Sequence, residues 1–325
     1  MNRLVAYLPT YRPVGGVLKV LDYAVHAIDL GLEVTIASQE EYRDGLIAFD
    51  DRRRRALTPD NGVRHVHGFG VGITPSDIAF FSWPRHYEEI ALRLGPLVQH
   101  RHVVHIVQNV RHANPAWDHG YPRRLLTRPM SRIYTNDVVR SAVAGLVHDG
   151  CPHAVIRLGH DVDFFASERD GLGSPIRVVH PTWKSRVGER VADLLERDER
   201  FTFEAIEGEV APGDLRDAYQ RADVVLGAPI AEEGFYMPGL EAMAAGALLI
   251  VPDAGGNMAY CRFGDNCLRA RLEDAGSYVE ALEAAAAMTS SQREEMRASG
   301  LATAALHTLH QESEGFGRFL TAISD

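Results

Sequence analysis

The sequence predicts an α/β protein in which two doubly wound parallel sheets form two Rossmann-like domains. Short apolar runs, such as residues 4–8 and 103–107, have the length of buried strands, and segments of helical periodicity, such as residues 17–30, lie between them. This alternation continues along most of the chain and favours parallel sheets. Because 325 residues are many for one hydrophobic core, we expect two domains.

The first predicted domain covers residues 1–168. Its apolar runs alternate with periodic segments in the order of a doubly wound sheet, with strands predicted at 4–8, 34–37, 78–81, 103–107 and 133–135 and helices at 17–30, 87–94 and 138–148. A polar stretch at 40–62 is expected to connect two of these elements. Its basic run at 52–55 is expected to lie in a solvated loop.

The second predicted domain covers residues 169–309 and follows a charged, glycine-containing stretch, 166–174, that is typical of a hinge. Its elements alternate in the same way, with strands predicted at 176–179, 201–206, 224–226 and 248–251 and helices at 189–195 and 213–221. Alanine-rich helices follow residue 272, and breaks are expected at 289–291 and 299–300.

Composition and charge exclude several classes of protein. The net charge of −10 argues against nucleic acid as a partner and leaves at most peripheral membrane contact. No apolar stretch has the length of a membrane span and the N-terminus lacks the zones of a signal peptide, so the expected location is the cytoplasm. The cysteines Cys151, Cys261 and Cys267 lack metal-ligand spacing and are expected to be free thiols.

The most informative stretch runs from Glu233 to Glu241 and reads E-G-F-Y-M-P-G-L-E. Its Gly-Phe pair favours a loop, and Pro238 suits the first turn of a helix that carries Glu241. The free N–H groups and positive dipole end of a helix N-terminus suit an anion such as a diphosphate. Carboxylates accept strong hydrogen bonds from sugar hydroxyls. A diphosphate beside a sugar indicates a nucleotide sugar.

This stretch resembles the E-x7-E motif of retaining GT-B glycosyltransferases of the family 4 type, also called group 1. The sequence matches the family motif at nine positions, Glu233, Gly234, Phe235, Pro238, Glu241, Ala242, Met243, Ala244 and Gly246. The resemblance implies two Rossmann-like domains that face each other across a cleft, with the donor on the C-terminal domain and the acceptor on the N-terminal one. It also implies that a last helix, at about 310–325, packs back on the N-terminal domain.

The activity implied by the resemblance is transfer of a sugar from a UDP- or GDP-linked donor to an acceptor hydroxyl, with retention at the anomeric carbon. No metal and no other cofactor is implied. In this scheme Glu233 holds sugar hydroxyls and Glu241 binds the ribose. The intervening segment positions the sugar and the phosphate through Gly234, Phe235, Tyr236, Met237 and Pro238.

A second resemblance argues against a metal site. Asp161 and Asp163 have the spacing of a D-x-D pair, which holds a divalent ion in some enzymes. The segment instead resembles the family's Gly-x-Asp-x-x-x-Phe signature, with Gly159, Asp161 and Phe165 at the matching places, where it is structural. We therefore expect no metal.

Cations for the departing diphosphate are expected from the lysines, because Lys19 and Lys184 are the only two in the chain. Lys184 and Arg186 lie in the loop after the strand at 176–179, where positive charge would stabilise the leaving group. Relatives carry an Arg and a Lys five residues apart there, whereas this sequence has His180 near the arginine position and a shifted lysine.

A glycine pair, Gly15 and Gly16, precedes the helix predicted at 17–30 and lets the backbone approach a phosphate closely. The pair resembles the glycine loop of the family's N-terminal domain. Lys19 falls where that loop often has a basic residue. All three residues are therefore expected to bind the donor.

Acceptor binding is expected in the loop after the strand at 103–107, since loops at strand ends carry much of the function of such folds. Its hydrogen-bonding side chains are Gln108, Asn109, Arg111 and His112. His112 is a candidate base, because an unperturbed histidine titrates near neutral pH. The acceptor, whether a glycan, a lipid-linked group or a natural product, is not specified by the sequence, nor is the oligomeric state.

Two other functions fit the same motif. A nucleotide-sugar epimerase or hydrolase on this fold would consume the donor without an acceptor, because a fold alone does not fix the chemistry. An inactive nucleotide-sugar-binding partner protein would bind the donor and turn over nothing. The atypical basic loop favours this last possibility, and so does Ala259, which stands where relatives often have a Glu.

Overall fold

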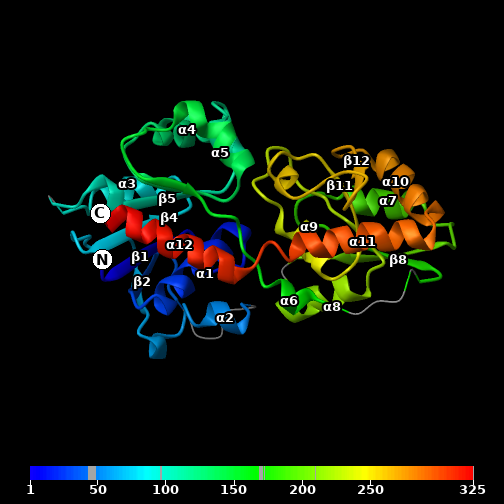
Figure 1. The fold of residues 1–325 in the computed structure, drawn as a ribbon, viewed down its shortest axis with the longest axis horizontal. Coiled ribbons are helices and arrows are strands. Elements are labelled where there is room, and N and C mark those ends of the chain that lie inside the picture. The colour runs from blue at the N-terminus through cyan, green and yellow to red at the C-terminus, as the bar shows by residue number, and fades with distance from the viewer. Residues whose placement is uncertain (43–48, 96, 168–170, 172, 209, 325) are drawn as a thin grey trace. The chain divides into compact units, whose positions relative to one another are not determined.

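The computed structural model describes residues 1–42, 49–95, 97–167, 171, 173–208 and 210–324. The chain divides into two compact units, of which one comprises Met1–Leu158 with Leu309–Asp325 and the other Gly159–Thr308 (Figure 1). Each unit contains one parallel sheet, so the predicted α/β fold class is confirmed. The boundary predicted after residue 168 lies outside the described residues, as does much of the hinge predicted at 166–174.

The N-terminal unit has a seven-stranded sheet in the order β3-β2-β1-β4-β5-β6-β7, and every pairing is parallel. The strands are β1 (Arg3–Leu8), β2 (Glu33–Ser38), β3 (Arg64–His67), β4 (Asp77–Phe81), β5 (Val103–Val107), β6 (Ser131–Tyr134) and β7 (His153–Val155). The five predicted strands are all present. The edge strands β3 and β7 were not predicted, because they are short and carry histidines instead of an apolar run.

Helices cover both faces of this sheet, as the alternation of side chains along β1 shows. Leu4, Ala6 and Leu8 pack on one face with α1 (Gly15–Asp29) and α12 (Leu309–Ser324), whereas Val5 and Tyr7 pack on the other. That second face is covered by α3 (His86–Ala91) and α4 (Tyr121–Leu126). The remaining helical segments are α2 (Asp51–Arg54), α5 (Asp137–Val143) and the 3-10 turns η1 (Pro59–Asn61), η2 (His100–His102), η3 (Val110–Ala113), η4 (Trp117–Gly120) and η5 (Ala144–Leu146).

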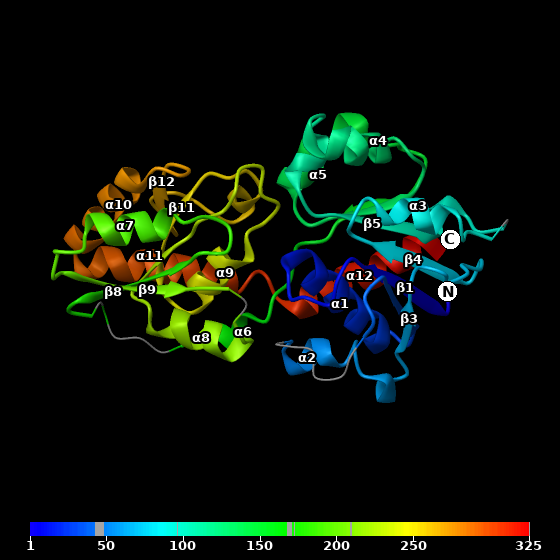
Figure 2. The same cartoon turned by 180° about the vertical axis from the view of Figure 1, so that it is seen from behind.

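The last helix, α12, belongs to the N-terminal unit although 150 residues of the other unit precede it. Figure 1 and Figure 2 show it in red beside α1, with both chain ends in this unit. Its apolar face buries Phe316, Phe319, Leu320 and Ile323 in the core, and each such side chain contributes roughly 1.5–3 kcal/mol. The expectation that the last helix packs on this unit is thus met by the geometry.

Lys19 does not point to solvent or to a ligand but lies at the centre of a buried ion-pair cluster. Its ammonium donates to Asp22 Oδ2 at 2.9 Å and to Glu312 Oε2 at 2.8 Å, and it is 1% exposed. His26 Nε2 lies 3.0 Å from the same Glu312 oxygen. The cluster joins α1 to α12. The prediction that Lys19 binds the donor is therefore replaced by a structural role.

The basic run at 52–55 takes part in the same cluster. Arg52 Nη1 donates to Asp22 Oδ1 at 2.7 Å, and Arg53 Nη2 donates to Asp22 Oδ2 at 2.9 Å. Arg53 is buried and also pairs with Asp50, which caps α2. The prediction of a solvated loop is therefore wrong for these two arginines, because a buried carboxylate on α1 draws them inward.

The C-terminal unit has a five-stranded sheet in the order β12-β11-β10-β8-β9, again with parallel pairings. Its strands are β8 (Ile176–Pro181), β9 (Phe201–Ile206), β10 (Val224–Leu226), β11 (Leu248–Pro252) and β12 (Leu268–Ala270). Its helices are α6 (Val162–Phe165), α7 (Val187–Leu194), α8 (Pro212–Arg221), α9 (Met237–Ala244), α10 (Ala275–Ala287), α11 (Ser290–Ala304) and the 3-10 turn η6 (Gly256–Ala259). The four predicted strands and both predicted helices are present.

One predicted helix break is wrong. Thr289 does begin a helix, since it forms a capping box with Gln292 at the start of α11. The helix then continues through Ser299 and Gly300. A Cβ on Gly300 would lie 3.4 Å from Met243 Cγ, so the glycine allows α11 to pack closely on α9 instead of ending it.

We predict that Glu312→Gln destabilises the folded chain by about 3–5 kcal/mol at pH 7, because it leaves the buried Lys19 with a weaker partner. Burial opposes ionisation of Glu312, but Lys19 and His26 outweigh it and hold its pKa below the usual carboxyl value. This stabilisation is complete above the unfolded-state pKa of about 4.3 and is lost as pH falls through the lowered folded-state pKa. Urea denaturation at pH 7 and at lower pH measures it.

The matched control is Glu314→Gln, an exposed carboxylate on the same helix. Equal stability of the two variants across the pH range would show that the cluster does not tether α12.

Candidate functional site

The strand order of the C-terminal unit places a crevice at β8. The neighbours of β8 are β9 on one side and β10 on the other, so the chain switches direction across the sheet at this point. In open α/β sheets, ligands bind outside the carboxyl ends of the strands at such a switch point. The loop after β8 carries Lys184, and the loop after β10 carries Glu233. The fold therefore brings together two predicted site residues 49 positions apart.

Glu233 is held by main-chain bonds to the loop after β11. Its N–H donates to Ala254 O at 2.8 Å, and its carbonyl accepts from Gly256 N at 2.9 Å. The two loops approach so closely that a Cβ on Gly256 would lie 1.7 Å from Gly234 O. Because only glycine fits there, Gly256 fixes the backbone from which the buried Glu233 side chain projects.

Tyr236 ends this loop in a left-handed conformation, with φ of 66°. Two buried bonds hold it there, since its hydroxyl accepts from Ala228 N at 2.8 Å and its carbonyl accepts from the Tyr260 hydroxyl at 2.7 Å. Helix α9 starts at the next residue, Met237, with Pro238 in its first turn. No side chain of the described residues caps this helix. Pro238 has no N–H and Gly239 N donates to Tyr236 O at 3.1 Å, so the Met237 N–H and the positive dipole end are what this terminus offers to an anion.

Lys184 meets Glu233 directly. Its ammonium donates to Glu233 Oε2 and lies 5.4 Å from the centroid of the Tyr236 ring. The Lys184 side chain is 31% exposed and that of Glu233 is 8% exposed, so the pair is open to solvent on the lysine side. Glu233 Oε1 accepts from Gly234 N at 3.2 Å. A cation, a carboxylate and a helix N-terminus thus lie together in this unit.

Two other residues of the predicted donor site point elsewhere. Arg186 pairs with Glu189 in the first turn of α7, which raises the pKa of the guanidinium, and its side chain is 79% exposed. Phe235 is a buried core residue whose ring centroid lies 4.9 Å from that of Tyr260. Only its backbone is therefore left to contact a donor. His180, near the family's arginine position, is buried against Gly188, and burial lowers its pKa. It does not replace the missing cation.

Glu241 lies on the buried side of α9 and is 6% exposed. Its Oε1 accepts from His160 Nε2 at 2.9 Å. Its Oε2 is buried and has no hydrogen-bond partner among the residues that the structure describes. His160 was not among the predicted site residues, although it occupies the variable position of the Gly-x-Asp signature, between Gly159 and Asp161.

In the N-terminal unit, the switch point lies between β1 and β4, the two neighbours at which the sheet changes direction. Gly15 and Gly16 open α1 there, and no side chain of the described residues caps that helix. Gln108 Nε2 donates to Gly16 O at 3.4 Å, and a Cβ on Gly16 would lie 3.8 Å from Ser82 Oγ. The fold thus places part of the predicted acceptor loop beside the glycine pair.

The rest of the acceptor loop forms a tight corner after β5. Asn109 precedes the turn η3 and accepts from Arg111 Nη2 at 3.3 Å, while the Arg111 guanidinium lies 5.5 Å from the Trp117 ring centroid. His112 is stacked between His105 and Trp117, with ring centroids 5.6 Å and 5.3 Å away. These contacts make the corner rigid.

His112 is a weaker base than the sequence suggested. Its pKa is lowered to about 3, mainly by burial and to a smaller extent by the positive charge of the nearby Arg111. A base works best when its pKa is close to the working pH, so the expectation of a histidine titrating near neutrality is corrected. The ring can still accept a hydrogen bond, because it is unprotonated at pH 7.

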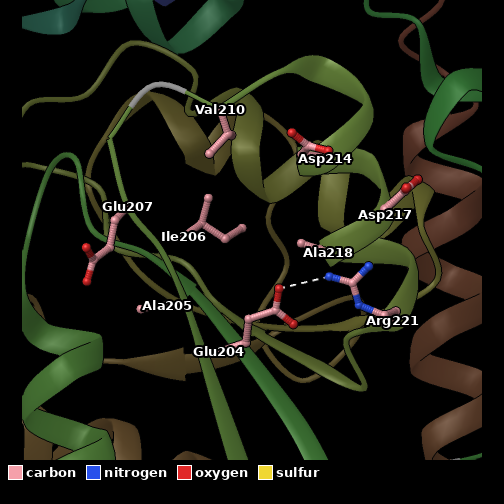
Figure 3. Close-up of a pocket in the computed structure, with 9 residues that line it drawn as sticks. All are labelled: Glu204, Ala205, Ile206, Glu207, Val210, Asp214, Asp217, Ala218 and Arg221. Carbon is pink, nitrogen blue, oxygen red and sulfur yellow. Dashed lines mark hydrogen bonds and ion pairs between the residues drawn. The ribbon is translucent and has the colours of Figure 1, made fainter.

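A surface pocket lies between β9 and α8, but its chemistry does not suit a diphosphate (Figure 3). It is lined by four carboxylates, one arginine and small or apolar residues, namely Glu204, Ala205, Ile206, Glu207, Val210, Asp214, Asp217, Ala218 and Arg221. The arginine is already paired, since Arg221 Nη2 donates to Glu204 Oε1 at 2.9 Å. None of the predicted site residues lines it.

The described residues contain neither a metal-type cluster nor a helix that could span a membrane. No group of three or more His, Cys, Asp or Glu side chains there has a metal-binding arrangement. Within the same ranges, no helix combines the length and the apolar character needed to cross a membrane. The three cysteines are unpaired thiols, as predicted.

Comparison with known proteins gives one family match and several structures of similar fold. Residues 187–287 match the family Glycosyl transferases group 1. A search of curated proteins found no match. Anabaena HepE, in a crystal structure with UDP and glucose, is similar over 99% of this chain and 100% of its own, with a TM-score of 0.73 and 12% identity.

Two further solved structures are similar along their whole length. Sucrose-phosphate synthase from Thermosynechococcus elongatus aligns over 99% of this chain and 98% of its own, with a TM-score of 0.75 and 13% identity. An α,α-trehalose 6-phosphate synthase from Burkholderia multivorans aligns over 100% and 99%, with a TM-score of 0.67 and 12% identity. The predicted GT-B type of fold, with two parallel-sheet α/β units, is confirmed.

We predict that Gly256→Ala destabilises the chain by about 1–3 kcal/mol, because the added methyl group collides with the backbone of Gly234 and forces the two loops apart. Gly213→Ala is the matched control, since no atom lies within 4 Å of its added Cβ. Chemical denaturation of both variants measures the difference. If Gly256→Ala were as stable as the control, the two loops would not be in the close contact described.

Proposed function

We propose that this chain is a retaining glycosyltransferase of the family 4 type, which transfers a sugar from a UDP- or GDP-linked donor to an acceptor hydroxyl. The observation that carries the proposal is the convergence of Lys184, Glu233 and the α9 N-terminus at the switch point of the C-terminal unit. The Glycosyl transferases group 1 match supports it. The HepE structure, with UDP and glucose, supports the nature of the donor.

The donor sugar is assigned to Glu233. An ionised carboxylate can accept hydrogen bonds from two neighbouring hydroxyls, and such bonds are roughly twice as strong as neutral ones. The backbone from Gly234 to Met237 then faces the sugar and the phosphate. Glu241 accepts from the ribose through Oε2, the buried oxygen with no partner among the described residues. Each carboxylate therefore has a separate hydroxyl-bearing target.

The leaving diphosphate is assigned to Lys184 and the N-terminus of α9, and Arg186 would have to leave Glu189 to join them. These groups supply positive charge where negative charge develops as the glycosidic bond breaks, and donors of this kind contribute several kcal/mol to the transition state. Lys184 must then turn from Glu233 to the phosphate, which its partly exposed position allows. Gly15 and Gly16 remain assigned to the donor. We propose that no metal is required.

The acceptor is assigned to the corner after β5, with Gln108, Asn109, Arg111 and His112. A pKa of about 3 makes His112 a poor base, so we propose that a phosphate oxygen of the departing diphosphate takes the acceptor's proton. His112, whose ring is unprotonated at pH 7, orients the sugar acceptor by accepting a hydrogen bond from it. Once the best donor is known, assays of transfer to glycans, lipid-linked groups and natural products identify the acceptor class.

We predict that a nucleotide sugar stabilises the chain. A donor present at 100 times its Kd adds roughly 2.7 kcal/mol to the free energy of unfolding. Thermal denaturation against UDP- and GDP-linked sugars, with the free monosaccharides as controls, identifies the best donor. If no nucleotide sugar raised Tm, the proposed function would be wrong. Consumption of the donor without any acceptor would favour the epimerase or hydrolase, and binding without turnover would favour the inactive partner protein.

We predict that Glu233→Gln lowers kcat on the order of 10²-fold, because a neutral amide holds the sugar hydroxyls less strongly in the charged transition state. Glu241→Gln is expected to raise mainly the donor KM, since the ribose is held equally before and during transfer. Steady-state kinetics with the best donor separates the two effects. Glu232→Gln, at the exposed neighbouring position, is the control. Near-normal kcat in Glu233→Gln would refute this assignment.

A further inference from the structure

Glu241 presents its two oxygens to different surroundings. Oε1 accepts from His160 Nε2 at 2.9 Å, and both side chains are nearly buried, at 4% and 7% exposure. Oε2 is equally enclosed but has no partner among the described residues. Burying a carboxylate oxygen without a hydrogen-bond donor costs free energy of folding. A ligand that donates a hydrogen bond to Oε2 would remove that cost.

His160 is itself firmly held. Its backbone N–H donates to His307 O at 2.9 Å, and it forms an isolated parallel bridge with Thr308. Its ring stacks on Phe165, with centroids 5.5 Å apart. The next residue, Asp161, caps α6 by accepting from Phe164 N at 3.2 Å. The imidazole therefore has one fixed position relative to α9, which packs against α6.

The contact also fixes where the proton lies. An ionised carboxylate can only accept, so the hydrogen of this bond belongs to Nε2. His160 Nδ1 is buried and has no hydrogen-bond partner among the described residues. A hydrogen on Nδ1 would lack an acceptor, so the hydrogen that the geometry requires is the one on Nε2. His160 thus satisfies one oxygen of Glu241.

We propose that His160 is a positioning residue for nucleotide recognition, which locks the Glu241 carboxylate so that Oε2 points at the ribose hydroxyls of a nucleoside diphosphate. The inference rests on the proposed function, because it takes Glu241 as the ribose ligand. A carboxylate bound at one oxygen keeps the direction of the other, whereas an unbound one rotates about its last single bond. Binding of the ribose therefore costs less conformational freedom when His160 is present.

A packing role and a positioning role of His160 predict different effects on nucleotide binding when the side chain is replaced. Loss of a packing residue weakens every nucleotide alike, because it disturbs the whole site. Loss of the positioning bond weakens only ligands that carry ribose hydroxyls. It is also repaired by another side chain that offers an N–H at the same place, such as the amide of glutamine.

The experiment measures binding of UDP and of 2′,3′-dideoxy-UDP by calorimetry, with GDP and its dideoxy form as the second pair. The proteins are the full-length wild type, His160→Leu, His160→Gln, Glu241→Gln and the double variant His160→Leu with Glu241→Gln. Thermal denaturation without ligand checks that each variant is folded. Leucine removes the hydrogen bond while keeping an apolar side chain, and glutamine restores a donor.

We expect His160→Leu to weaken binding of the ribonucleotide about tenfold, because the freed Glu241 carboxylate must then be ordered when the ribose binds. His160→Gln should lie within about threefold of the wild type. Both variants should bind the dideoxy nucleotide as the wild type does, and His160→Leu should add nothing to Glu241→Gln. Such non-additivity is expected of two residues that act as one unit.

Other outcomes overturn the inference in distinguishable ways. Equal weakening of the ribo- and dideoxynucleotide by His160→Leu, or no rescue by glutamine, would make His160 a packing residue and leave the proposed function intact. If UDP bound His160→Leu as tightly as the wild type but bound Glu241→Gln more weakly, His160 would not position Glu241, and the proposed function would again stand. If the wild type bound neither UDP nor GDP, the proposed function and this inference would both be wrong.

Discussion

The ion pair between Lys184 and Glu233 is the interaction on which the site depends. It joins the loop after β8 to the loop after β10, on either side of the switch point of the C-terminal sheet. In a site that is partly withdrawn from water, opposite charges at contact distance interact much more strongly than in bulk solvent. Each partner can also bind a different group of a nucleotide sugar. The Lys184 ammonium can pair with a phosphate, and the Glu233 carboxylate can accept hydrogen bonds from hydroxyls. The pair joins the two loops and, in the proposed function, exchanges its partners for a donor.

The two lysines of the chain show how surroundings decide the use of one residue type. Lys19 is enclosed by Asp22 and Glu312, so its charge is neutralised and it joins α12 to α1. Lys184 has one carboxylate partner, an aromatic ring nearby and an open side. Removal of a buried partner leaves an uncompensated charge, so the first lysine is tied to stability. The second is partly exposed, so it is able to change partners.

Much of the fold and the core of the site could be predicted from the sequence, because their signals are local. The apolar runs that became β1 and β11 and the E-x7-E stretch are read within ten residues of chain. Features that depend on distant partners were missed or misjudged. The Lys19 cluster needs Glu312, nearly three hundred residues away, and the His160 bond needs Glu241. Gly300 looked like a helix break because its packing partner, Met243, lies on another helix.

The most direct test of the site is a crystal structure of the chain with an intact nucleotide-sugar donor. We predict that the sugar hydroxyls lie within hydrogen-bonding distance of the Glu233 carboxylate, and that the diphosphate lies between Lys184 and the N-terminus of α9. The ribose should lie against Glu241 Oε2. A donor bound in the acidic pocket between β9 and α8, with the Lys184–Glu233 pair unbroken, would contradict the proposed site.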